Sequence, residues 1–407
     1  MPQPDHKRLL HRMKHDKTLD GIRGLAILWV LSFHLFSMPL KPAFLAHVPV
    51  LDFVASYGWA GVSLFFVLSG YLITKGLIEA NKGKAWFKRF WCRRVFRIVP
   101  LYVVLLLTYG VGSFLARSSS GITKQWFSGS IPLWSYLIFA QNLFMASAGY
   151  LGNDWLRVTW SLALEEQFYL FISLFIFLVP MGKSKRWILL LICGSLLFRY
   201  SIFFTQSNSQ TAVIVLLPSR LDGFLLGALL AFSDGYFDTN AFMARYARAG
   251  MLLAMAFSIG FVLLLGSGRF GGASLFFVPL YHSAIAIGCS ALLGLGLGPG
   301  MIWLKRILQA KPLIVSGKVS YFLYLFHMPV CMVLYYEILG SAPNLASASA
   351  MLVMLLVIVV LYGLAALSFI YLERPLIAFS KTLYNYPGSQ RAEKSSCQAG
   401  DPVLRIN

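Results

Sequence analysis

The sequence is poor in charge, and above all in acidic charge. Only 12% of its 407 residues are charged, and Asp and Glu number 15 against 35 Lys and Arg. Charged residues make up about a quarter of a typical soluble domain, so this composition excludes an ordinary soluble protein. Hydrophobic residues form 58% of the chain, and the mean hydropathy is +0.71. The chain is therefore predicted to lie in a lipid bilayer.

Cysteine and several ligand-binding motifs are also scarce or missing. The five cysteines are Cys92, Cys193, Cys289, Cys331 and Cys397. Their odd number and scattered spacing indicate neither a disulfide framework nor a zinc site. The sequence has no G-x-x-x-x-G-K-[ST] loop for ATP, and no basic stripe interleaved with aromatic residues. We therefore expect no metal and no nucleic-acid partner.

Long apolar runs are abundant instead. About 20 apolar residues cross the ~30 Å of a bilayer core as a helix, and ten segments meet this length. They lie at about residues 22–40, 59–78, 94–116, 160–180, 187–204, 212–232, 248–266, 274–297, 319–340 and 348–372. The first is read as an uncleaved span, because no small-residue cleavage site follows it. The predicted fold is an all-α, polytopic membrane helix bundle of about ten transmembrane helices.

Basic residues are distributed unevenly between the spans. With ten spans and the N-terminus inside, the inner segments hold 23 Lys and Arg and the outer segments hold 5. Short cytoplasmic loops collect Lys and Arg, so both termini are predicted to be cytoplasmic. A crossing by the apolar residues 131–147 would place the later basic clusters outside. We therefore expect that segment to lie at the membrane interface or to re-enter the protein.

Two polar residues of the first span share a helix face. Arg23 and His34 lie eleven residues apart in LDGIRGLAILWVLSFHL, close to three helical turns, which places His34 ~18 Å deeper than Arg23. Polar groups in spans usually face a partner or a water-filled cavity. The alternative for His34 is a packing histidine bonded to a neighbouring span.

Two further motifs carry charge near span ends. WSLALEEQFYL contains Glu165 and Glu166, and Glu165 shares a face with Tyr169 at the i, i+4 spacing. Glutamates that snorkel to water are the alternative. RRVFRIVP places Arg94 and Arg97 one turn apart, where they could hold a phosphate or simply flank a span on its cytoplasmic side.

Two motifs carry polar residues deeper in the bundle. PSRLDGFLLG places Arg220 and Asp222 after Pro218 near mid-membrane, where an ion pair is the alternative to a functional role. YFLYLFHMP places Tyr324 and His327 on one face, where packing is the alternative.

Depth brings these residues together. From the predicted span ends, His34, Arg220 and Asp222 each lie ~18 Å from the cytoplasmic edge, and Glu165 lies ~22 Å from it. We therefore expect the four side chains to meet around one buried cavity.

These stretches, with GWAGVSLFFVLSGYLI and the terminal YLERP, resemble the membrane acyltransferase family 3, which includes bacterial polysaccharide and peptidoglycan O-acetyltransferases. They follow the family order over residues 19–375. The resemblance implies transfer of an acyl group, usually acetyl from cytoplasmic acetyl-CoA, to a hydroxyl of a glycan or other acceptor. It implies a membrane acyltransferase domain over 22–375 in the bacterial inner membrane. The basic residues of 1–21 predict a cytoplasmic N-terminal segment, and the polar residues of 376–407, with Gly, Ser and Gln, predict a mobile cytoplasmic tail.

The family pattern falls on particular residues. Its basic residue followed by ten residues and a histidine matches Arg23 and His34, its Arg-x-x-Arg matches Arg94 and Arg97, and its glutamate five after tryptophan matches Glu165. The resemblance implies that His34 is the general base, that Glu165 orients it, and that the arginines hold coenzyme A phosphates. We expect the cavity or substrate path to include Tyr169, Arg220, Asp222, Tyr324 and His327.

The sequence departs from the family pattern at Ser63, where many members have Asp. Larger members also continue into an extracytoplasmic SGNH hydrolase-like domain, and transfer to such a domain would need a separate periplasmic protein here. The alternative function is a transporter or flippase for a glycan or lipid-linked sugar, which would also place buried charges around a midplane cavity.

Overall fold

The chain forms a bundle of membrane-spanning helices. A computed structural model describes residues 16–38, 49–80, 86–116, 122–206, 208–233, 241–266 and 274–383. In these residues, ten helical segments are long and apolar enough to cross a membrane. Each overlaps one predicted span, and no strand is present in the ranges just given. The predicted all-α bundle of ten spans is confirmed.

The spanning segments contain both continuous and interrupted helices. They are α2 (Lys17–Ser32) with the π-helical η1 (Phe33–Ser37), η3 (Gly58–Ala60) with α4 (Gly61–Ala80), α5 (Trp86–Leu115), η5 (Arg157–Thr159) with α9 (Trp160–Leu178), α10 (Met181–Thr205), α11 (Ser209–Val215) with α12 (Leu217–Ser233), α13 (Ala241–Gly266), α14 (Ser274–Leu297), α17 (Ser320–Leu339), and α18 (Ala348–Ser368) with η7 (Phe369–Glu373) and α19 (Arg374–Thr382). Shorter helices connect them: α3 (Pro49–Ser56), α6 (Ile122–Phe127), α7 (Leu133–Leu137), α8 (Gln141–Ala148), α15 (Ile302–Leu308) and α16 (Lys311–Lys318).

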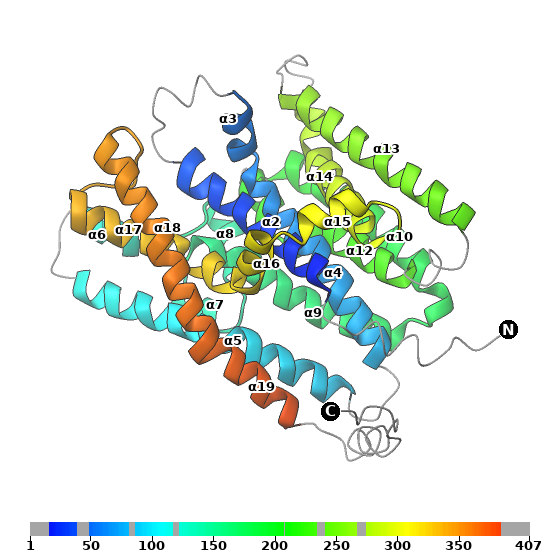
Figure 1. Cartoon of the computed structure of the whole chain (residues 1–407), viewed down its shortest axis with the longest axis horizontal. Helices are drawn as coiled ribbons and strands as arrows, with labels where there is room; N and C mark the ends of the chain where they lie inside the picture. Colours follow the sequence, from blue (N-terminus) through cyan, green and yellow to red (C-terminus); the bar gives the residue numbers. More distant parts are fainter. Residues whose placement is uncertain are drawn as a thin grey trace, which may run out of the picture.

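The centre of the bundle is formed by α2, α4 and α12, while α13 lies at one edge beside α14 and α5 lies toward the opposite edge (Figure 1). The most apolar window of α4 is 67% buried in the protein, against 6% for that of α13. The central helices therefore face other helices on most sides, whereas α13 presents most of its surface to lipid.

Glycine allows the central helices to approach very closely. A Cβ added to Gly24 of α2 would lie 1.9 Å from the carbonyl oxygen of Leu313 in α16, and one added to Gly70 of α4 would lie 1.9 Å from that of Phe224 in α12. Small residues at such crossings permit backbone contact between membrane helices. The short helix α16 is therefore pressed directly against the Arg23 end of α2.

Residues 131–147 do not span the membrane. They fold into α7 and α8, separated by Phe139, which has a positive φ of 54°. Gln141 and Asn142 are fully buried, and their side-chain amides donate to the carbonyls of Thr159 and Val215. The segment thus re-enters the protein. This is one of the two placements that loop charge predicted for these apolar residues.

The sixth span is broken in its apolar interior. Leu216 is extended between α11 and α12, and Pro218 follows it. The Ser219 hydroxyl donates to the carbonyls of Val213 and Leu216 at 2.8 Å each. Because an unpaired carbonyl is costly in a bilayer, these bonds stabilise the break.

The two ends of the chain are described only in part. Residues 1–15 of the predicted basic segment and residues 384–407 of the predicted tail lie outside the described residues. The first part of the predicted tail, up to Thr382, belongs to the helix α19.

Candidate functional site

A cavity of about 100 Å³ lies between α2, α4, α5, α9 and α17. Its polar lining consists of Arg23, Ser69, Arg94, Arg97, Ser161, Glu165, Tyr169, Ser320, Tyr321 and Tyr324. Six of the ten predicted site residues are in this group, and they come from four different spans. The remaining four, His34, His327, Arg220 and Asp222, do not line the cavity.

Glu165 is held through both of its carboxylate oxygens. Oε1 accepts a hydrogen bond from the Ser69 hydroxyl of α4 at 2.8 Å, and Oε2 accepts one from the Tyr169 hydroxyl at 3.1 Å. Tyr169 lies one turn further along α9, as the i, i+4 spacing predicts. The carboxylate is therefore fixed in the cavity wall.

Arg94 and Arg97 of α5 face this wall with donors to spare. The Arg94 guanidinium carbon lies 5.5 Å from the ring centroid of Tyr169 and 5.7 Å from that of Phe90, in cation–π geometry. In the described part of the chain, no carboxylate oxygen lies within the 4.0 Å ion-pair distance of either arginine. Both guanidinium groups can therefore bind an anionic ligand.

Arg23 reaches the cavity from α2. Its Nη1 donates to Asp20 Oδ1 at 3.4 Å, a long bond, and its side chain is 21% exposed. A guanidinium carries five N–H donors, so most donors of Arg23 remain available. Three cationic groups thus converge on one end of the cavity.

Two histidines face each other further along the same helices. The ring centroids of His34 and His327 are 4.9 Å apart. Nδ1 of His34 lies 3.1 Å from the carbonyl oxygen of Val30, and Nδ1 of His327 lies 3.0 Å from that of Leu323. A carbonyl can only accept, so in a neutral ring the proton sits on Nδ1 and the lone pair on Nε2. Nε2 of His327 is buried without a hydrogen-bond partner.

Tyr324 connects the histidine pair with the cavity. It lines the cavity, and its ring centroid lies 6.2 Å from that of His327. Its hydroxyl donates to the Val158 carbonyl at 3.1 Å and lies 2.5 Å from the Ser161 hydroxyl. The polar path from the arginines to the histidines therefore follows one face of α17.

The structure does not place His34 against Glu165. The hydrogen-bond partners of Glu165 are Ser69 and Tyr169, and the ring next to His34 across the helix interface is His327. Glu165, which was expected to orient His34, thus lies in the cavity wall. The backbone carbonyl of Val30 orients the His34 imidazole instead.

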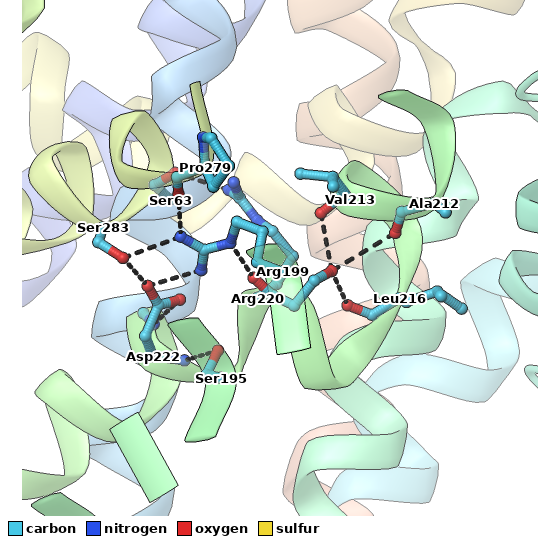
Figure 2. A network of polar contacts seen from close by, with 12 residues as sticks. Ser63, Ser195, Arg199, Ala212, Val213, Leu216, Arg220, Asp222, Pro279 and Ser283 are labelled. Carbon is cyan, nitrogen blue, oxygen red and sulfur yellow. Dashed lines mark hydrogen bonds and ion pairs between the residues drawn. The ribbon is translucent and has the colours of Figure 1, made fainter. Parts of the chain in front are cut away.

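A second polar cluster lies between α10, α12 and α14 (Figure 2). Arg199 is fully buried, and its Nε donates to the Ser219 carbonyl at 2.7 Å. Its Nη1 donates to the Pro279 carbonyl at 2.7 Å and to the Ser283 hydroxyl at 2.8 Å. Its Nη2 forms an ion pair with Asp222 at 2.7 Å. All of these contacts of Arg199 are made to groups within the protein.

The predicted meeting of Arg220 and Asp222 with Glu165 is not observed. Asp222 bonds Arg199, while Arg220 Nη2 donates to the Ser63 hydroxyl at 2.8 Å. Residues two apart on a helix point about 200° apart, so the two side chains face different neighbours. Equal depth in the membrane did not imply one cavity.

Sequence analysis missed Arg199, although a signal was present. A lone arginine inside the predicted span 187–204 is costly in lipid and requires a partner. It also assigned no role to Ser69 or to Tyr321, although both lie in quoted motifs, GWAGVSLFFVLSGYLI and YFLYLFHMP. The Tyr321 hydroxyl donates to the Ile98 carbonyl at 2.8 Å and ties α17 to α5.

No metal site is present among the residues that the structure describes, since no three His, Cys, Asp or Glu side chains are grouped to hold an ion. The arrangement offers three other elements: a cationic entrance, a narrow polar cavity and a pair of basic imidazole nitrogens. These are suited to binding a phosphorylated ligand and to removing a proton.

Comparison with known proteins identifies a family and relatives of this chain. Residues 16–366 match the acyltransferase 3 family, described as an acyltransferase domain. O-acetyltransferase OatA of Staphylococcus aureus (strain NCTC 8325 / PS 47) is 29% identical over 401 residues, covering 92% of this chain and 60% of OatA. "Putative O-acetyltransferase SACOL0978" of Staphylococcus aureus (strain COL) is 27% identical over 348 residues, covering 78% of this chain and 51% of that protein.

The chain thus spans between about half and three fifths of the length of these relatives. No solved structure matches it. The family match begins at the start of α2 and extends into α18, and so includes every helix that lines the cavity. This chain therefore belongs to the acyltransferase 3 family and is a multi-pass membrane protein of that family.

Proposed function

We propose that the protein is a membrane O-acyltransferase that moves an acetyl group from acetyl-CoA, or another acyl from its coenzyme A thioester, to a hydroxyl of an envelope or exported glycan. The observation that carries this proposal is the polar path itself. Arginines with available N–H donors lie at one end, and two histidines whose Nδ1 atoms face backbone carbonyls, so that Nε2 carries the lone pair, lie at the other. Membership of the family and the names of the relatives support it.

The Arg23 end of the bundle faces the cytoplasm in this proposal. The 23 to 5 asymmetry of basic residues supports the orientation, with both termini inside a bacterial inner membrane. Reporter fusions should place Lys185 and Arg306 in the cytoplasm, and Lys124 and Ala342 outside. A fusion that reports Lys185 outside would contradict this orientation and the binding of the donor from the cytoplasm.

The arginines hold the phosphates of the donor. Arg23, Arg94 and Arg97 bind them with charge-assisted hydrogen bonds, and the slender pantetheine arm carries the thioester along the cavity toward Tyr324. The cavity is lined both by these arginines and by Tyr324, so the arm lies within it in this proposal while the nucleotide stays at the cytoplasmic entrance.

His34 acts as the general base. Its Nε2 removes the proton of the acceptor hydroxyl as that oxygen attacks the thioester carbonyl. The carbon–sulfur bond then breaks, the coenzyme A thiolate leaves, and the imidazolium returns the proton to it. The Val30 carbonyl accepts the hydrogen bond from Nδ1–H throughout the reaction, and this keeps Nε2 directed at the acceptor hydroxyl.

Glu165 is a positioning residue in this scheme. Its carboxylate fixes the Tyr169 hydroxyl, and the Tyr169 ring lies against Arg94. Loss of the carboxylate should therefore disturb donor binding before it disturbs the base. This role differs from the orienting role that the family resemblance implies, and Glu165→Gln tests it by the split between KM for acetyl-CoA and kcat.

The acceptor path leads to the opposite side of the membrane. A separate periplasmic protein is one candidate to receive the acyl group; direct transfer to the glycan is the other. Comparison of envelope glycans from wild-type and deletion strains by mass spectrometry identifies the acceptor.

A transporter is the competing function, and the broken sixth span is the observation that favours it, since transporters bind substrates at such breaks. Here the polar groups at the break are bonded by Ser219, Asn142 and Arg199. Purified protein should release coenzyme A from acetyl-CoA when the glycan acceptor is added. Transmembrane flux of glycan without coenzyme A release would overturn the proposal.

A further inference from the structure

A second cavity opens on the lipid-facing side of the bundle. It has a volume of about 280 Å³ and is lined by three spans, with Leu226 and Leu230 from α12, Gly250, Met251 and Ala254 from α13, and Ala291 from α14. It does not touch the cavity beside Glu165. Because its walls are membrane-spanning helices, what enters it is hydrocarbon.

The walls of this groove suit a slender, flexible chain. Gly250 leaves its mouth open, since no atom lies within 4 Å of a Cβ added there. Met251 packs along Gly294 of α14, where an added Cβ would lie 2.6 Å from the thioether sulfur. A methionine adapts its shape to a neighbouring ligand more easily than a branched residue does.

One end of the groove is cationic. Arg248 lies two residues before Gly250, and its guanidinium covers Gly300 just beyond α14, where an added Cβ would be 2.0 Å from Nη1. Arg245 is exposed one turn earlier on α13. Both arginines lie at the start of the candidate span 245–264, where basic residues attract the headgroups of anionic phospholipids.

We propose that this groove binds one acyl chain of an anionic phospholipid, with the lipid phosphate at Arg248. The inference uses the proposed orientation only to assign the cytoplasmic leaflet and is independent of acyl transfer. A bound lipid fills a space between α12, α13 and α14 that the protein leaves open, and it secures the weakly buried α13 to the bundle.

Two matched glycine substitutions test the site. Gly250→Leu fills the groove, whereas Gly260→Leu lies on the same helix, is also open around its Cβ, and lines no part of the groove. Both remove a helix-interior glycine, so their effects on helix propensity match. Binding of phosphatidylglycerol and of phosphatidylcholine with identical chains is measured by native mass spectrometry on detergent-purified protein.

Wild type and Gly260→Leu should each retain one phosphatidylglycerol, and Gly250→Leu should bind it at least about tenfold more weakly, since lipid affinity follows the apolar area buried. Arg248→Gln should lose the preference for phosphatidylglycerol over phosphatidylcholine. Equal retention by both leucine variants means an annular lipid and overturns the site. If Gly250→Leu does not fold, Ala254→Leu fills the same groove, and wild-type protein without lipid preference overturns the proposal in either case.

Discussion

The cavity beside Glu165 and the cluster around Arg199 both hold charge inside the membrane, but they are built in opposite ways. Arg199 is fully buried and makes four hydrogen bonds within the protein. Arg94 lies against two aromatic rings, and both Arg94 and Arg97 line a cavity, without a carboxylate at ion-pair distance in the residues described. The Arg199 cluster is therefore complete as folded, whereas the half-buried guanidinium groups of Arg94 and Arg97 have donors that the proposed donor phosphates would occupy.

This difference separates two consequences of mutation. Changes in the Arg199 cluster should lower stability, because every bond there is internal. Changes along the path from Arg94 to His34 should lower binding or rate and leave the fold intact. Each prediction below tests whether the two regions behave differently.

The largest effect is expected at the base. His34→Gln keeps hydrogen-bonding capacity but cannot accept a proton near neutral pH, so acetyl transfer should fall by about 10² to 10⁴-fold with an unchanged thermal midpoint in detergent. His282→Gln is the control, because His282 is a half-buried histidine of α14 packed on Trp59 and does not line the cavity. A wild-type rate in His34→Gln would make His34 a packing residue and move the search to His327 or Glu165.

The next effect concerns stability. Asp222→Ala leaves the Arg199 guanidinium buried without its counter-ion, and breaking such a pair costs about 3–5 kcal/mol. The thermal midpoint in detergent and the yield of folded protein should both fall sharply. Glu165→Gln retains an acceptor for Ser69 or Tyr169 and should shift the midpoint much less. Similar losses in the two variants would show that both clusters are structural.

Donor binding should respond to the cavity arginines. The Arg94→Ala/Arg97→Ala variant loses charge-assisted bonds that contribute about 1.5–3 kcal/mol each, so coenzyme A binding should weaken by more than about tenfold. The remaining affinity should depend less on salt, since fewer screened charges take part. Arg93→Ala is the control, because Arg93 is exposed on the same helix and does not line the cavity. Equal affinities in both variants would assign these arginines to the membrane flank.

A smaller gain is expected at Ser63. Arg220 Nη1 is buried without a hydrogen-bond partner, and its Nη2 bonds the Ser63 hydroxyl. Ser63→Asp should supply a counter-ion and raise stability by about 1 kcal/mol, while Ser63→Asn supplies polarity without charge. If the Asp variant unfolds at a lower temperature than the Asn variant, the arginine is already satisfied and the added carboxylate is merely desolvated.

Much of the fold could be predicted because hydropathy and loop charge act locally. The lengths of the apolar runs located all ten spans, and loop charge excluded residues 131–147 as an eleventh. The i, i+4 spacing placed Glu165 beside Tyr169, and the motifs drew attention to most of the cavity lining. Their roles in catalysis remain predictions.

The partners of buried charges could not be predicted in this way. Asp222 pairs with Arg199 because α10 crosses α12, and Arg220 reaches Ser63 because α4 packs on the opposite side of α12. Depth along a helix is readable from the sequence, but the direction of a side chain around the axis acquires meaning only when the neighbouring helices are known. His34 and Glu165 illustrate the same point, since they belong to different parts of one path.

The ion pair between Arg199 and Asp222 also bears on how the chain enters the bilayer during synthesis. The two residues lie on consecutive spans, with α10 ending at Thr205 and α11 beginning at Ser209. A single arginine or aspartate at the centre of an inserting helix costs about 2.5–3.5 kcal/mol. A hairpin that carries both can form the pair before it meets lipid, so these two spans should leave the translocation channel together. A nascent chain that stops after Thr205 would present Arg199 to lipid alone.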